Sequence, residues 1–304
     1  MREARRMGMG APKEDRRGRF TLHRTPGEDM TWQIGDVTVT RVEEHVMELP
    51  TRYLVPGLTA DLVAAAGDWA APHFTADGES MMLSIHAFVV QSGDRTIVVD
   101  TCIGDPGQSL PGDPEFADRL DAAIDGGLDA VDIVLCTHLH FDHVGLNTRE
   151  VGGEWVPTFP NARYLVSSAE LEHTRSDDHM GVWDTSIAPL EAAGLLTGVA
   201  MDHEIDERVR LVPTPGHTPG HVCVRIDSGG ESAIITGDMS HSPLQFAHPD
   251  CSAAPADDDE PTAIATRVAF ITEHLDTDTL LLGTHFAPPT SGHLVSGASG
   301  TEFR

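Results

Sequence analysis

The sequence predicts an α/β sandwich in which two β-sheets lie face to face and helices cover their outer sides. Three observations predict this fold class. The first half of the chain is rich in strand-like segments, the second half mixes short strands with helical segments, and no segment repeats at a fixed period. Sheets and helices that are apolar on one side bury that side by packing in layers around a common core.

The composition predicts a globular protein with a strongly acidic surface. Apolar residues make up 40% of the 304 residues, which is enough for a sizeable core. The chain carries 48 carboxylates against 20 Lys and Arg, a formal net charge of −28. Such a surface repels phosphate backbones and anionic lipid, so we expect no nucleic-acid or membrane partner and a small-molecule substrate. Solubility or adaptation to salt explains the charge more simply than an electrostatic field with a functional role does.

Two features of the chain indicate a cytoplasmic protein. The Arg-rich residues 1–20 contain no apolar core of a secretion signal, and no apolar stretch approaches the roughly 18 residues that span a bilayer. The four cysteines form no C-x-x-C pair, which indicates free thiols in a reducing compartment. We expect residues 1–30 to form a disordered tail and residues 31–304 to form a single domain.

The first half of this domain is expected to be rich in strands. Residues 32–42 alternate apolar and polar side chains around a Gly-Asp turn, which predicts an antiparallel hairpin. Strands are also expected over residues 81–90 and 96–99, and the second of these ends in Asp100.

The segment of about residues 48–80 is expected to be irregular, with one short helix over residues 60–66. A connection of this length in a compact domain usually forms a lid, a wall of the substrate pocket or an arm between subunits. We therefore expect a homodimer, with this segment embracing a second subunit, covering the site, or both.

The second half is expected to mix strands with helices. Ser228-Gly229-Gly230 predicts the turn of a hairpin. The acidic residues 256–261 are expected to form a loop that supplies carboxylates and a proline to the start of a helix. Helices are expected over residues 111–125, 168–175, 183–193 and 262–275. Strands are expected over residues 131–136, 162–166, 208–212, 222–226, 232–235 and 279–282, the last of which is expected to be the final strand.

One stretch carries a high density of metal-binding side chains. Residues 138–143 contain three imidazoles and a carboxylate in the pattern H-x-H-x-D-H, just after the apolar residues 131–136. Histidine and aspartate are poor core residues, because burying a polar group without a partner is costly. Neutral imidazole and carboxylate are ligands that zinc prefers, and a loop that leaves a buried strand holds them on a rigid support. The stretch therefore predicts a metal site.

Three further candidates lie where expected strands end. His217 lies in the loop Pro213-Thr-Pro-Gly-His-Thr-Pro-Gly-His221, where two Pro-Gly pairs stiffen the backbone. Asp238 and His285 each follow a short apolar strand. Strand ends that converge on one edge of an α/β sandwich bring such side chains together.

These motifs resemble the metallo-β-lactamase-fold hydrolase superfamily, and the resemblance covers the chain from about Trp32 to the C-terminus. It implies a four-layer αβ/βα sandwich with two metal ions. One metal would be held by His138, His140 and His217, and the second by Asp142, His143 and His285. Asp238 would bridge the two, and Asp100 would accept a hydrogen bond from a ligand imidazole and fix its tautomer.

The number of ligands also fits two metals on chemical grounds. Two ions about 3.5–4 Å apart need a bridging carboxylate and a bridging hydroxide. A closed structural zinc site uses four ligands, whereas the larger set here leaves positions open for hydroxide and substrate. We expect two divalent ions, zinc first, with manganese, iron or cobalt as alternatives.

Departures from individual branches of the superfamily narrow the expected chemistry. The B1 β-lactamases carry a cysteine at the second metal where this chain has Asp238, and flavodiiron proteins have a glutamate where it has His140. β-Lactam hydrolysis and di-iron redox chemistry are therefore disfavoured. Acyl-homoserine lactonases resemble this chain in all its candidate ligands, but His241 stands where they have a tyrosine. His241 is either a hydrogen-bond donor or general acid, or a solvated loop histidine.

Three other residues are weaker candidates for a substrate pocket. His86 lies on the strand before Asp100, and Trp69 and Phe286 are large side chains that could form apolar walls. An ordinary place in the core explains each of them as well, and the sequence leaves both interpretations open.

The expected function is that of a dinuclear metal-dependent hydrolase that cleaves a small uncharged lactone or carboxylic ester with a metal-bridging hydroxide. Asp238, Asp142 and His241 are the expected catalytic residues, with Asp238 positioning the nucleophile and His241 protonating the leaving group. Organophosphate triester hydrolysis and hydrolytic dehalogenation remain alternatives, because the same nucleophile serves all three. A non-hydrolytic iron oxygenase of this fold is the alternative from another class, but such a centre lacks most second-site ligands.

Overall fold

The computed structural model of the chain describes residues 22–23, 30–104, 110–298 and 300–304. The tail expected over residues 1–30 lies outside the described residues except for Leu22, His23 and Met30, which belong to strands. None of the helices in the described ranges is long and apolar enough to cross a membrane.

The first sheet combines antiparallel strands at one side with parallel strands at the other. Its strands are β1 (Leu22–His23), β2 (Met30–Ile34), β3 (Val37–Pro50), β4 (Ser80–Ser92), β5 (Arg95–Val99), β6 (Ile133–Leu135), β9 (Arg163–Ser167) and β10 (Leu196–Val199). Their order is β1-β3-β4-β5-β6-β9-β10, and β2 pairs with β3. The strands β5, β6, β9 and β10 run parallel, so their carboxyl ends lie at one edge.

The second sheet has the order β11-β12-β13-β14-β15. Its strands are β11 (Val209–Pro213), β12 (Val222–Ser228), β13 (Glu231–Ile235), β14 (Leu280–Leu282) and β15 (Ser291–Gly292). β12 runs antiparallel to β11 and β13, whereas β13 and β14 are parallel. The carboxyl ends of β11, β13 and β14 therefore share one edge. Two separate hairpins are formed by β7 (Thr148–Val151) with β8 (Glu154–Pro157), and by β16 (Leu294–Gly297) with β17 (Gly300–Phe303).

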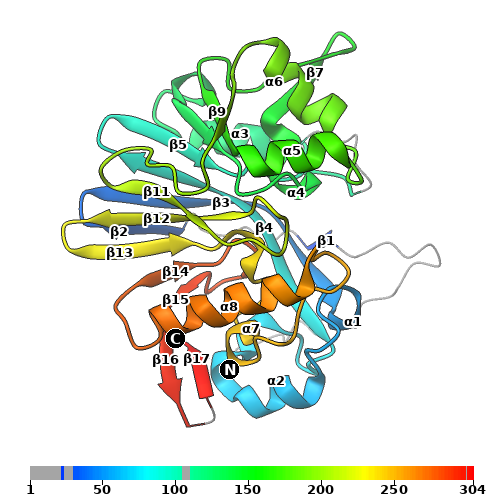
Figure 1. Cartoon of the computed structure of the whole chain (residues 1–304), viewed down its shortest axis with the longest axis vertical. Coiled ribbons are helices and arrows are strands. Elements are labelled where there is room, and N and C mark those ends of the chain that lie inside the picture. Colours follow the sequence, from blue (N-terminus) through cyan, green and yellow to red (C-terminus); the bar gives the residue numbers. More distant parts are fainter. Residues whose placement is uncertain (1–21, 24–29, 105–109, 299) are drawn as a thin grey trace, which may run out of the picture.

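Helices cover the outer side of each sheet, as Figure 1 shows with α5 and α8 on opposite sides of the stacked sheets. The first sheet is covered by α3 (Phe116–Ala122), α5 (Ser168–Ser176) and α6 (Ala188–Ala192), and the second by α7 (Leu244–Ala247) and α8 (Glu260–His274). The sequence of layers is helices, sheet, sheet, helices. The prediction of a four-layer αβ/βα sandwich is confirmed.

Three apolar clusters hold these layers together, and neighbouring residues of one strand contribute to different clusters. Ile97 and Val99 of β5 pack between the two sheets, whereas Val98 faces the helices of the first sheet. Likewise Val224 faces the other sheet and Cys223 faces α7 and α8. Strands buried on both faces read as continuous apolar runs, which is why the sequence showed no clean alternation there.

The segment between β3 and β4 contains short helices. α1 (Thr51–Leu54) follows β3 directly, and α2 (Ala60–Ala66) has the bounds expected from the sequence. The two 3-10 turns η1 (Gly67–Trp69) and η2 (Ala71–His73) complete the segment. The predicted irregular stretch is therefore a series of short helical turns.

Two sequence-based expectations about elements were wrong. Residues 279–282 do not form the final strand, because β15, β16 and β17 follow β14; these strands are only two to four residues long and rich in glycine and serine. Residues 183–193 form a π-helical turn, η5 (Trp183–Ile187), followed by α6, rather than one helix. Pro189 in the first turn of α6 lacks a backbone N–H, so it cannot donate to the preceding turn.

Candidate metal centre

The H-x-H-x-D-H stretch lies where β6 ends, at the carboxyl edge of the parallel strands. His138 and His140 belong to the loop, and the one-turn helix α4 (Phe141–Val144) carries the aspartate and the third histidine. Gly145 ends this turn against the loop after β5, because a Cβ there would collide with the carbonyl oxygen of Ile103. The close approach of these two loops fixes where the ligand side chains point.

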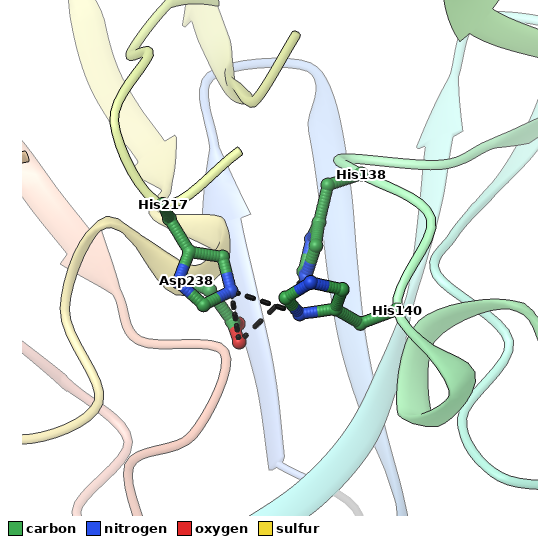
Figure 2. Close-up of side chains that lie close together, drawn as sticks. All are labelled: His138, His140, His217 and Asp238. Carbon is green, nitrogen blue, oxygen red and sulfur yellow. Dashed lines mark hydrogen bonds and ion pairs between the residues drawn. The ribbon is translucent and has the colours of Figure 1, made fainter. Parts of the chain in front are cut away.

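Four buried side chains converge on a first candidate metal position: His138, His140, His217 and Asp238, whose tips point toward one another in Figure 2. The Nε2 atom of His217 lies 3.0 Å from Nδ1 of His140 and 3.4 Å from Oδ2 of Asp238. Nε2 of His138 lies 3.8 Å from the same carboxylate oxygen. The four ligand atoms lie within 4.8 Å of one another, which is close enough to surround one ion.

A second group, Asp142, His143 and His285, lies on the other side of Asp238. Nε2 of His143 is 3.2 Å from Oδ1 of Asp238. Nε2 of His285 is 3.1 Å from the same oxygen and 3.6 Å from Oδ2 of Asp142. Asp238 thus turns Oδ2 toward His138 and His217 and Oδ1 toward His143. Nε2 of His285 lies close to both oxygens, at 3.2 Å from Oδ2, so the carboxylate contacts both groups.

Asp100 lies behind two of the candidate ligands. Its Oδ2 atom accepts Nδ1–H of His143 at 2.9 Å and the hydroxyl of Thr137 at 2.8 Å. The Thr137 oxygen, having donated its proton, accepts from Nδ1 of His138 at 3.1 Å. Both rings therefore carry their proton on Nδ1 and present the Nε2 lone pair to the centre. Asp100 has a φ of 57°, a left-handed conformation that aspartate tolerates better than most residues.

Two further acceptors orient the histidines that come from the second sheet. Nδ1 of His217 lies 2.9 Å from Oδ1 of Asp257, whose side chain is fully buried. Nδ1 of His285 lies 2.8 Å from the carbonyl oxygen of Ser84. Because a carboxylate or carbonyl oxygen can only accept, Nδ1 of each ring carries a proton, and Nε2 is the atom that faces the centre.

The electrostatics of the centre act differently on its groups. Burial would lower the pKa of His143 and His285, but the Asp238 carboxylate raises the pKa of both above the ordinary value. Burial, together with His143, holds the pKa of His138 well below its ordinary value, so that this imidazole is neutral. Burial alone would raise the pKa of Asp238, but the neighbouring imidazoles of His143, His285 and His241 hold it well below its ordinary value. Asp238 is therefore ionised.

Several atoms of the centre support binding of cations. Nε2 of His138, Nε2 of His143 and Oδ1 of Asp238 are buried and have no hydrogen-bond partner among the described residues. Such atoms are costly unless something satisfies them, and a divalent cation does so for imidazole and carboxylate. The residues present therefore fit two divalent ions, one in each group, on either side of Asp238.

The sequence model of the Metallo-beta-lactamase superfamily matches residues 82–285, about two thirds of the chain. The chain belongs to the metallo-β-lactamase superfamily. The match includes every residue of the two candidate metal groups, and it confirms the resemblance expected from the sequence.

Curated members of the superfamily are similar to parts of this chain. It is 29% identical over 232 residues to the lactamase-like protein notP of Aspergillus sp. (strain MF297-2), which covers 73% of this chain and 60% of that protein. It is 26% identical over 187 residues to an N-acyl homoserine lactonase of Bacillus sp, which covers 56% of this chain and 69% of that protein. The chain thus spans about three fifths to two thirds of the length of these two relatives.

Solved structures share the fold over nearly the whole chain. "AidC, a Dizinc Quorum-Quenching Lactonase" superposes with a TM-score of 0.73 at 21% identity, covering 91% of this chain and 96% of that one. The "hydrolase AbOPH in beta lactamase superfamily" superposes with a TM-score of 0.75 at 23% identity, covering 92% and 97%. At these identities the superpositions establish the metallo-β-lactamase fold.

His241 lies inside the candidate metal centre rather than on the surface. It is 3% exposed, and its Nε2 atom is 3.1 Å from Oδ2 of Asp238. Its ring stacks on His285 with centroids 5.4 Å apart, and its backbone N–H donates to Gln245 Oε1 at 2.8 Å. His241 can therefore donate toward the centre, or join His285 and Asp238 as a third candidate group of ligands.

Three residues orient other residues around the centre but were not identified in this role from the sequence. Asp257 lay in the acidic run that was expected to supply carboxylates to the start of a helix, and the carbonyl of Ser84 has no sequence signal at all. His221 ends the His217 loop, and its Nε2 accepts the backbone N–H of Asp238 at 2.8 Å. Burial holds the pKa of His221 at about 4, so its ring is neutral and can accept this bond.

The three candidate pocket residues lie at different depths. His86 is 2% exposed; its Nδ1 is 2.8 Å from the Ser84 hydroxyl, and Phe88 packs edge-on against its ring. Phe286 is 1% exposed and packs against other aromatic rings in the cluster between the second sheet and α8. Trp69 is half-buried against two apolar clusters. A place for any of them in the substrate pocket stays a prediction.

Proposed function

We propose that this protein is a dinuclear metal-dependent hydrolase whose substrate is a small uncharged lactone or carboxylic ester. The observation that carries the proposal is the position of Asp238 between two groups of inward-facing ligands, with one carboxylate oxygen toward each. An ionised carboxylate shared in this way can hold two metal ions at the short separation that two-metal hydrolases use.

In this proposal the side chains of the centre have separate roles in binding metal and orienting the nucleophile. Bound metal ions would supply an activated hydroxide and polarise the carbonyl oxygen of the substrate. His138, His140 and His217 would hold the first ion, and Asp142, His143 and His285 the second. Asp238 would orient the nucleophile from between them. Oriented ligands raise catalytic efficiency because the charges need not reorganise during reaction.

His241 would act on the substrate side of the centre. Its position 3.1 Å from Asp238 and against His285 brings an imidazole beside the candidate metal groups. An imidazole there can donate a proton as general acid. One relative is named an N-acyl homoserine lactonase, and one structural neighbour is named a lactonase. Both names support an acyl substrate.

A substrate panel combined with metal analysis tests this function. Protein purified without chelator should contain about two metal ions per chain, with zinc our first expectation. Lactones and carboxylic esters should be cleaved faster than phosphotriesters and chloroaromatics. Faster cleavage of either of the latter would select the organophosphate hydrolase or dehalogenase alternative, and an iron-rich, oxygen-consuming protein would select the oxygenase alternative.

The variant Asp238→Ala should lose one metal ion and most turnover, because it removes the shared ligand. Asp250→Ala, at an exposed aspartate, is the matched control and should keep both. Unchanged metal content and activity in Asp238→Ala would contradict the bridging role.

We also propose that the protein works as a homodimer in the cytoplasm. Its four cysteines are free and buried, which supports a reducing compartment. Light scattering should give the mass of two chains, and the mass of one chain would contradict the dimer.

A further inference from the structure

One buried carboxylate near the centre belongs to neither metal group. Glu170 lies in the first turn of α5, and it is 1% exposed. A buried carboxylate is costly unless strong hydrogen bonds satisfy it. Its partners therefore indicate why the fold retains it.

The three donors that reach Glu170 come from two different loops. Oε1 accepts the backbone N–H of Leu139 at 3.0 Å. Oε2 accepts the hydroxyl of Thr218 at 2.7 Å and the backbone N–H of Gly220 at 3.1 Å. Leu139 lies between two candidate ligands of the first metal group, and Thr218 directly follows the third.

The helix start is built to fit this contact. Ser167 caps α5 by accepting from the N–H of Glu170 at 3.1 Å, and its hydroxyl donates to the carbonyl of Gly220 at 2.7 Å. A Cβ at Gly220 would collide with the backbone nitrogen of Glu170. The second Pro-Gly pair of the His217 loop is thus explained by close packing against α5.

A second contact joins the same helix to the His217 loop. One turn after Glu170, Nε2 of His173 lies 2.9 Å from Oδ2 of Asp258. The backbone N–H of Asp258 donates to the carbonyl of His217 at 2.9 Å. α5 is therefore joined to the His217 loop directly through Glu170 and indirectly through Asp258.

We propose that Glu170 is a positioning residue that fixes the first metal group by tying the loop of His138 and His140 to the loop of His217. This proposal rests on the proposed metal function. One carboxylate joins a loop of the first sheet to a loop of the second. It adds to the backbone hydrogen bond in which the N–H of Val222 donates to the carbonyl of Thr137 at 3.1 Å, and unlike that bond it reaches the residue between His138 and His140. Groups that orient metal ligands in this way are worth about 10- to 100-fold in metal affinity.

The variant Glu170→Gln separates this role from simple packing. Gln keeps the shape, and its amide oxygen can still accept from Thr218 and Gly220. Its NH₂ then faces the N–H of Leu139. Because both groups are donors, the hydrogen bond to Leu139 is lost. The loop that carries His138 and His140 should therefore be the one that loses its hydrogen bond to the α5 side chain.

The experiment measures how fast metal leaves the loaded protein in excess chelator. One metal of Glu170→Gln should be released about tenfold faster than from the parent protein, the lower end of the range for orienting groups. The visible spectrum of the cobalt-substituted variant should also change. Glu172→Gln, at an exposed carboxylate of the same helix, is the matched control and should match the parent in both.

A milder variant keeps the test decisive if Glu170→Gln does not fold. Thr218→Val removes one donor to Glu170 and keeps the shape, so it should speed metal release by a smaller factor. Parental release rates and cobalt spectra in a folded variant, even with lower stability of the metal-free form, would overturn the positioning role. A parent protein that binds no metal would instead overturn the proposed function, and this role with it.

Discussion

The imidazoles of the centre show how single residues prepare a metal site. Acceptors behind His143, His217 and His285 fix the proton on Nδ1, and Thr137 does the same for His138. Every one of these rings then turns Nε2 toward the centre as the atom that would bind a metal. The orientation is set before any ion binds, so the ligands lose little conformational entropy on binding.

At the same scale, His241 is a candidate general acid. His241→Ala should lower turnover of a lactone roughly 100-fold, the lower end for a lost general acid, without changing metal content. Steady-state kinetics and metal analysis of the same preparations measure both. His248→Ala, at a half-buried histidine, is the control. His241→Tyr would restore a donor and recover part of the rate, whereas loss of a metal from His241→Ala would make this residue a ligand.

Sequence reasoning reached the candidate ligands because each lies just past an apolar strand in a recognisable pattern. Through the family resemblance it also named Asp100 behind a ligand imidazole, but it did not reach the other groups behind the ligands. Glu170 is 31 residues from Leu139, and Asp257 is 40 residues from His217, so no local pattern connects either pair. The Ser84 acceptor is a backbone carbonyl, which every residue possesses. Only the three-dimensional structure brings these groups together.

At the scale of elements, the acidic run shows how one loop serves two purposes. Asp259 caps α8 by accepting from the N–H of Thr262, as expected for carboxylates at a helix start. Two residues earlier, Asp257 turns inward to His217 and also accepts from the N–H of Ala253 at 2.9 Å. The sequence predicted the first role from the position of the run, but the inward turn depends on tertiary packing.

Asp257→Asn tests this loop. The amide cannot accept from both His217 and Ala253, so the His217 ring loses its charged partner or the loop loses a hydrogen bond. We expect metal affinity to fall about tenfold, measured by competition with a chromophoric chelator. Asp250→Asn, at an exposed aspartate seven residues earlier in the chain, is the control. Parental affinity in Asp257→Asn would mean that the orientation of His217 does not depend on this carboxylate.

At the scale of the whole molecule, the centre lies where the two sheets meet. His138, His140, Asp142 and His143 follow β6 of the first sheet, whereas His217, Asp238 and His285 follow strands of the second. Each metal group draws ligands from both sheets. The layers were predictable because apolar runs mark buried strands, while the short final strands, rich in glycine and serine, carry no such signal.

Metal bound in this place should hold the two sheets together, which leads to a prediction about stability. A ligand that binds only the folded state stabilises it by about 4 kcal/mol at a thousandfold excess over its Kd. For a chain of this size that corresponds to a Tm roughly 6 °C lower after chelation. Calorimetry should show this fall, and added zinc should reverse it. Asp238→Ala should show a smaller fall, because it lacks the carboxylate shared by both groups. A Tm that is identical with and without metal would contradict a centre that joins the sheets.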